Sequence, residues 1–135
     1  MIKKLSHVGI AVKDLRSSIG LFSRLFGVTD VPTERVADQH VEVGFIRTGG
    51  ASVELTASTS PESPIAKFIG NRGEGVHHLS FEVDDIRAEI SRLTADGFQM
   101  IDKEPRVGAG GYWIAFIHPK STNGVLVEIS QKIPG

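Results

Sequence analysis

Two histidines and two glutamates of this 135-residue chain recur at matching positions of an internal repeat. The segment around His7 aligns with the segment around His78, 71 residues further on. Glu54 aligns with Glu128 at an offset of 74, after an insertion of three residues in the second copy. Imidazole nitrogen and carboxylate oxygen both bind divalent transition metals, and a repeated unit brings equivalent residues to a common point. The repeat therefore predicts a metal site made by His7, Glu54, His78 and Glu128.

The composition limits what else the chain can be. It contains no cysteine, so any metal must be held by nitrogen and oxygen, and a reducing cytoplasm is the expected compartment. A formal net charge of −1 gives no reason to expect nucleic acid as a partner. No apolar run is long enough for a secretion signal or a membrane span, so we expect no membrane partner. The remaining partner class is a small molecule or another subunit.

The strands that carry the histidines show period-two alternation. In the first copy Val8, Ile10 and Val12 share one strand face, and His7 lies on the other. In the second copy His78 lies on the same face as a serine and a glutamate, opposite three apolar residues. Each histidine is thus predicted on the face that lines a cavity, while the apolar face packs in a core.

A helix is expected directly after each of these strands. Asp14 is positioned to cap the first helix, and Asp84 or Asp85 the second, with Gly27 and Gly97 as the ends. The three further strands of each copy are predicted near 28–36, 41–47 and 52–57, and near 100–103, 113–118 and 125–130. The chain therefore has the pattern βαβββ twice.

One domain is expected over residues 1–135, made of two modules at about 1–58 and 75–135. The linker, residues 59–74, begins with a turn-rich segment and continues into a short helix at 65–69. Neither module is long enough to be stable alone.

A set of two histidines and two glutamates suits a six-coordinate divalent ion such as cobalt, manganese, nickel or zinc. Four protein ligands leave two adjacent positions for a substrate that chelates through two oxygens, and the ion then acts as a Lewis acid on negative charge developing beside a carbonyl. His77, His40 and His118 have no equivalent in the other copy, and His77 faces away from His78, so we assign them no metal role.

Three segments, residues 63–68, 73–86 and 118–128, carry a more specific signal. With the paired modules, each bearing a ligand on its first and last strand, they make the chain resemble the methylmalonyl-CoA epimerases of the vicinal oxygen chelate superfamily over nearly its whole length. The resemblance implies an α+β fold in which two tandem βαβββ modules form a curved mixed sheet around the metal site. The metal ligands of the family match the same four residues as the repeat.

The resemblance also implies a reaction, the interconversion of (R)- and (S)-methylmalonyl-CoA through a metal-stabilised enolate. Inversion of a carbon needs a proton carrier on each of its faces. Glu128 matches one carrier in the family. Some members place the second, a glutamate, at the position of Val43, where this chain departs from the pattern. Glu54, Glu42 or a water molecule remains as the substitute, although alternation turns Glu42 to the opposite face unless a bulge intervenes.

Two other functions compete with epimerisation. One is another metal enzyme of the superfamily, such as lactoylglutathione lyase; an extradiol dioxygenase fits less well, because its iron usually takes two histidines and one carboxylate. The other is a non-catalytic small-molecule-binding protein on the same fold, which needs no metal ligands. We expect an isomerase acting on an acyl-CoA substrate and assembled as a homodimer.

Overall fold

The computed structural model describes residues 1–135 and forms two compact units. One unit contains residues 8–77, and the other contains residues 1–7 together with 78–135. The division falls inside strands β1 (Ile2–Ala11) and β5 (Gly75–Val83), so each of these strands contributes residues to both units. None of the helices has both the length and the apolar character needed to span a membrane.

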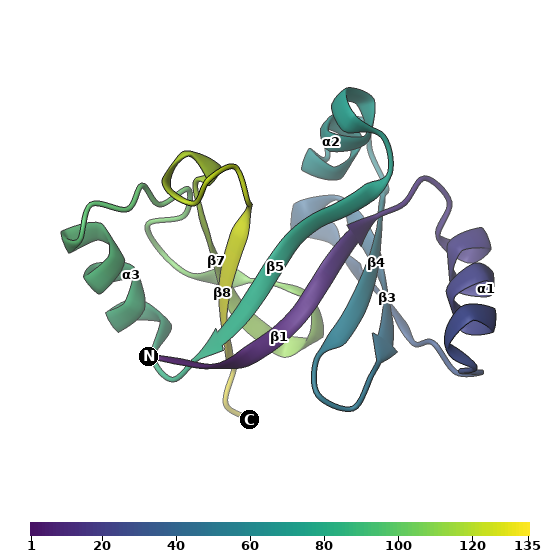
Figure 1. Ribbon diagram of the computed structural model, residues 1–135, viewed down its shortest axis with the longest axis horizontal. Helices are drawn as coiled ribbons and strands as arrows, with labels where there is room; N and C mark the ends of the chain where they lie inside the picture. Colours follow the sequence, from purple (N-terminus) through teal and green to yellow (C-terminus); the bar gives the residue numbers. More distant parts are fainter. The chain divides into compact units, whose positions relative to one another are not determined.

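The 8–77 unit holds a sheet in the order β2-β3-β4-β1, in which β2, β3 and β4 pair antiparallel. Besides the parts of β1 and β5, its elements are α1 (Leu15–Phe26), β2 (Thr33–Val36), β3 (Val41–Arg47), β4 (Ser52–Ser58) and α2 (Pro64–Arg72). Helix α1 lies against β3 and β4 (Figure 1).

Helix α1 begins and ends where the sequence predicts. The Asp14 side chain accepts a hydrogen bond from the Ser17 amide at 3.0 Å, a cap worth about 1 kcal/mol. Gly27 ends the helix with φ 68°, a left-handed conformation that glycine adopts without steric cost. One stripe of α1 packs with the strand face that carries Ile46 and Leu55.

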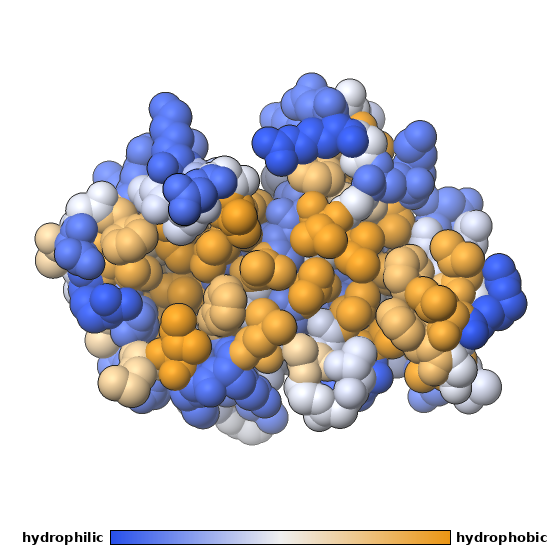
Figure 2. All heavy atoms as spheres, in the orientation of Figure 1, coloured by the Kyte–Doolittle hydropathy of each residue, from blue (hydrophilic) through white to orange (hydrophobic).

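Another part of the α1 surface is apolar and open to solvent. Leu21, Leu25 and Phe26 are 53%, 67% and 45% exposed, and Figure 2 shows hydrophobic atoms gathered over this helix. Large apolar side chains gathered on a surface are typical of a contact site for another molecule.

The second unit is a mixed sheet in the order β5-β8-β7-β6. Its elements beyond β1 and β5 are α3 (Ile86–Ala95), β6 (Arg106–Val107), β7 (Tyr112–Ile117) and β8 (Val127–Lys132). Strands β5 and β8 pair in parallel, while β7 pairs antiparallel with both β8 and β6.

Helix α3 covers one face of this sheet at β7 and β8 (Figure 1). Asp85 caps it by accepting a hydrogen bond from the Ala88 amide at 3.1 Å, which settles the choice between Asp84 and Asp85. Val83, Ala115 and Ile129 pack beneath the helix in one core. Because alternate residues of a strand point to opposite faces, Phe116 and Glu128, next to Ala115 and Ile129, lie on the face away from α3, and so does His78, five residues before Val83.

The order strand, helix, three strands occurs twice, so the predicted βαβββ pattern is confirmed. The strand predicted at 100–103 is wrong. Only Met100 forms a β-bridge, to Ile117, and the strand next to β7 is instead the two-residue β6. The linker helix is also longer than predicted, since it runs from Pro64 to Arg72; Ser63 caps its start, with Pro64 in the first turn, and Gly73 ends it.

Candidate metal centre

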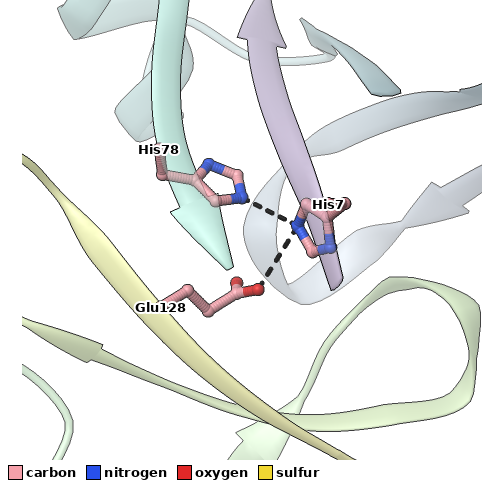
Figure 3. A group of neighbouring side chains, drawn as sticks. All are labelled: His7, His78 and Glu128. Carbon is pink, nitrogen blue, oxygen red and sulfur yellow. Dashed lines mark hydrogen bonds and ion pairs between the residues drawn. The ribbon is translucent and has the colours of Figure 1, made fainter. Parts of the chain in front are cut away.

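Three of the four predicted ligands come together within one unit. His7 lies on β1, His78 on β5 and Glu128 on β8, and all three side chains are buried. Their ligand atoms all lie within 4.8 Å of one another, a spacing that suits coordination of a single ion. Figure 3 shows the three side chains converging from their separate strands.

The histidine rings meet through equivalent nitrogens. Nε2 of His7 lies 3.0 Å from Nε2 of His78, and the rings stand nearly perpendicular, at 87°. Oε1 of Glu128 lies 3.3 Å from the same His7 nitrogen. On the other side of the His7 ring, Nδ1 lies 3.2 Å from the Ser6 hydroxyl. This contact helps to fix the ring orientation, as outer-sphere partners of metal-bound histidines do.

Burial sets the protonation of these groups. Desolvation lowers the pKa of His7 to about 4, so its imidazole is neutral at neutral pH and has a lone pair to donate. Desolvation also raises the pKa of Glu128 to about 7, although the Ser80 hydroxyl and the charge of Arg106 act in the opposite direction. A cation bound beside Glu128 would favour its charged form.

The donor set fits a divalent cation. Oε1 of Glu128 is buried and accepts no hydrogen bond, which is costly for an isolated carboxylate oxygen. The two Nε2 atoms are 3.0 Å apart, so one of them must carry a hydrogen and donate it to the other, and only one keeps a lone pair as an acceptor. An ion at the common point of the three atoms would satisfy all of them, and nitrogen with oxygen ligands suits the four metals named from the sequence.

The Phe116 side chain contacts His78, and the sequence did not predict this contact. Its ring packs edge-on against His78 with centroids 5.5 Å apart, and it is the direct cross-strand partner of Glu128. Asp102 accepts a hydrogen bond from the Phe116 amide at 2.9 Å and pairs with Arg106 at 3.1 Å. The Arg106 guanidinium lies 5.8 Å from the Phe116 ring centroid. The repeat aligns Phe116 with Phe45, but a phenylalanine in a strand gives no signal that it lies beside a site, and neither Asp102 nor Arg106 was selected from the sequence.

The other residues considered for the site, Glu54 and Glu42, belong to the 8–77 unit. Glu54 is on β4 as the cross-strand partner of Phe45. Glu42 lies on the opposite face, which α1 covers, and its carboxylate accepts a hydrogen bond from Arg16 at 2.9 Å. No bulge interrupts the register from Val41 to Arg47, so the alternation expected for Glu42 and Val43 holds.

The three histidines without repeat partners have local contacts of their own. His77 packs edge-on against Phe68 at 4.9 Å. His118 accepts a hydrogen bond from the Lys120 amide at 3.0 Å and caps a short turn of helix. His40 adopts φ 55° at the end of another such turn.

The comparisons with known proteins agree with one another. Residues 6–116 match the family model described as Glyoxalase/Bleomycin resistance protein/Dioxygenase superfamily. The chain is 38% identical over 133 residues to ethylmalonyl-CoA/methylmalonyl-CoA epimerase of Cereibacter sphaeroides, covering 97% of this chain and 99% of that protein. It is 37% identical over 132 residues to mitochondrial methylmalonyl-CoA epimerase of Dictyostelium discoideum, covering 97% of this chain and 80% of that protein.

Solved structures give the same result. Methylmalonyl-CoA epimerase from Mycobacterium tuberculosis superposes with a TM-score of 0.93 at 35% identity, covering 98% of this chain and 90% of that one. A methylmalonyl-CoA epimerase in complex with methylmalonyl-CoA and NH4+ superposes with a TM-score of 0.91 at 29% identity, with coverage of 98% and 96%.

Proposed function

Since the chain belongs to the methylmalonyl-CoA epimerase family within the glyoxalase superfamily, we propose that it interconverts (R)- and (S)-methylmalonyl-CoA and uses a divalent ion held by His7, His78 and Glu128. The observation that carries this proposal is the convergence of these three ligand atoms within 4.8 Å. Identity of 38% along nearly the whole of an epimerase supports the substrate.

Each residue of the triad has a definite task. His7 and His78 supply imidazole nitrogens, and Ser6 and Phe116 respectively fix their orientation. Glu128 supplies a carboxylate whose two oxygens allow it to be both a ligand and a proton carrier at the substrate α-carbon. The ion, when bound, supplies Lewis-acid stabilisation of the negative charge that develops next to the thioester carbonyl.

The ligand set and the second proton carrier extend beyond the triad. We propose Glu54 as the fourth ligand, on the strength of the repeat that pairs it with Glu128. Glu54 is also our choice for the second proton carrier, because Glu42 faces α1 and is engaged by Arg16. Cobalt, manganese, nickel and zinc are the proposed metals.

The composition and the surface of the chain support a compartment and an oligomeric state. We expect a cytoplasmic protein, as the lack of cysteine suggests. A homodimer is supported by the exposed apolar residues of α1, because such a surface is usually covered by a partner.

The test is a comparison of two substrates on one preparation of the protein. Each of the four metals is added in turn, and the conversion of (S)-methylmalonyl-CoA is measured beside that of the glutathione hemithioacetal used by lactoylglutathione lyase. Epimerisation alone is the expected result. Turnover of the hemithioacetal alone would assign the chain to the other enzyme, and turnover of neither with any metal would favour the binding protein.

A further inference from the structure

Arg106 lies on the face of the sheet that carries the triad. On β6 it is the antiparallel partner of Ile114, and Ile114 in turn pairs with Ser130 across β7 and β8. Directly paired residues of neighbouring strands point to one face. Ser130 follows Glu128 by two residues on β8, so the side chains of Arg106 and Glu128 point to the same face.

The Arg106 guanidinium contacts the aromatic ring that also contacts the triad. Its carbon Cζ is 5.8 Å from the Phe116 ring centroid, and this ring is 5.5 Å from that of His78, centroid to centroid. Phe116 is also the direct cross-strand partner of Glu128. The backbones of β6 and β8 are two strand spacings apart, about 10 Å, a gap that a long arginine side chain narrows.

The ion pair of Arg106 leaves one edge of the guanidinium available. Asp102 pairs with Nε at 3.1 Å, and the same carboxylate accepts the hydrogen bond of the Phe116 amide at 2.9 Å. The Asp102 side chain is 15% exposed and that of Arg106 is 44% exposed, so the acid is the more buried partner. Nη1 and Nη2 donate no hydrogen bond within the protein. These two nitrogens are therefore open to an anionic ligand, while Nε is held.

The position of this edge indicates which anion it binds. Methylmalonyl-CoA has two kinds of anionic group, its carboxylate and the phosphates of CoA. The carboxylate is bonded directly to the carbon whose proton Glu128 is proposed to carry, whereas the whole pantetheine arm separates the phosphates from that carbon. A carboxylate is also planar, and its two oxygens match the fork of a guanidinium in a bidentate pair.

We infer that Arg106 binds the carboxylate of the substrate and selects 2-carboxyacyl thioesters over acyl thioesters that lack this group. The role rests on the proposed epimerase function. Asp102 is then a positioning residue, because its carboxylate joins the guanidinium to the backbone of Phe116. No proton is transferred in this contact, since a guanidinium stays charged throughout the physiological range of pH.

The experiment measures ligand binding to the full chain by titration calorimetry with Co²⁺ present. Malonyl-CoA and acetyl-CoA are compared, because they differ only in the carboxylate. Arg106→Met removes the charge and keeps an apolar stem beside Phe116, and Arg106→Lys keeps the charge without the planar fork. We expect Arg106→Met to weaken malonyl-CoA binding by about tenfold or more, since a hydrogen bond to a charged group is worth about that factor, and Arg106→Lys to weaken it less. The affinities for acetyl-CoA and for Co²⁺ should stay unchanged.

The matched control is Arg87→Met, which removes another arginine of the same unit. Arg87 forms an ion pair with Glu104 at 2.7 Å, and both side chains are exposed. It lies on α3, which covers the other face of the sheet, so this variant should bind malonyl-CoA as the wild-type protein does. The control separates a general loss of positive charge from loss of the contact with the carboxylate.

Three results would overturn the inference. The first is an affinity for malonyl-CoA in Arg106→Met equal to that of the wild-type protein. The second is an equal loss for malonyl-CoA and acetyl-CoA, because Arg106 would then bind the phosphates that both ligands share. The third is a loss of Co²⁺ affinity large enough to account for the weaker binding, because Arg106 would then act through the ligand set.

Failure of the proposed function gives a different result. A wild-type protein with no epimerase activity would refute that function. The comparison of malonyl-CoA with acetyl-CoA needs no turnover, so it still decides whether Arg106 binds the carboxylate.

Discussion

Nε2 of His7 and Nε2 of His78 lie 3.0 Å apart, although the two residues are separated by 71 positions in the sequence. Two imidazoles in contact through the same nitrogen form one hydrogen bond at most, so the geometry of this pair suits binding of a metal ion, which accepts lone pairs from both nitrogens. Glu128 completes the arrangement with a buried oxygen that has no hydrogen-bond partner.

His78→Ala should abolish tight metal binding. The ring supplies one of three converging ligand atoms, and loss of an outer-sphere partner alone typically weakens binding by about 10- to 100-fold, so loss of a ligand should cost more. Titration calorimetry with Co²⁺ on wild-type and variant protein measures the difference. His118→Ala is the control, since His118 lies outside the triad and its ring bonds only the local Lys120 amide. Equal affinity in wild type and His78→Ala would remove His78 from the ligand set.

Glu128→Gln should lose turnover more severely than metal. The amide oxygen still coordinates an ion, but the amide does not accept a proton, so kcat should fall by about a hundredfold or more. Parallel measurement of kcat and of Co²⁺ content in the same preparation separates the two effects. Full activity in a metal-loaded Glu128→Gln protein would contradict the role of Glu128 as a proton carrier.

Glu54→Gln tests the second proton carrier. If Glu54 carries the second proton, the variant should stop epimerisation while exchange of the α-proton with deuterated solvent continues from one stereoisomer through Glu128. Glu42→Gln should leave both rates unchanged, because Glu42 faces α1. Proton nuclear magnetic resonance and chiral analysis of the product measure exchange and inversion separately. Unaltered epimerisation in both variants would point to a water molecule as the second carrier.

The acid stability of the fold should depend on Glu89. Arg92 donates hydrogen bonds to this buried carboxylate, at 3.0 Å for the shorter, and holds its pKa below the ordinary 4.5. A carboxyl group with a lowered pKa in the folded state stabilises the fold above its unfolded pKa, and that contribution is lost as pH falls through the folded value. The free energy of unfolding should therefore fall more steeply below pH 4.5 in wild type than in Glu89→Gln. Urea titrations at several pH values measure both slopes, and parallel slopes would contradict the assignment.

The sequence predicted the parts of the molecule that repetition and periodicity describe. Three of the four residues selected by the repeat converge in one unit, and α1 begins and ends at the residues expected from Asp14 and Gly27. Glu54 lies in the other unit, and its role as a ligand still depends on the repeat.

Other parts were beyond the reach of local patterns. Asp102 falls where a strand was predicted, but its carboxylate bonds the Phe116 amide and Arg106, so the segment after Met100 leaves the sheet. Strand β6 has only two residues, both exposed, and so has no alternation to detect. The cross-strand pairing of Ser80 with Glu128 depends on the parallel register of β5 and β8, which sequence spacing does not encode.

The most direct measurement of the central claim follows the α-proton of (S)-methylmalonyl-CoA in deuterated water by proton nuclear magnetic resonance. Protein treated with a chelator is compared with the same protein after addition of Co²⁺. We predict no exchange and no inversion in the chelated sample, and both in the reloaded sample, with His78→Ala inactive in either state. Equal inversion by the chelated and reloaded proteins would contradict a metal-dependent epimerase built on His7, His78 and Glu128.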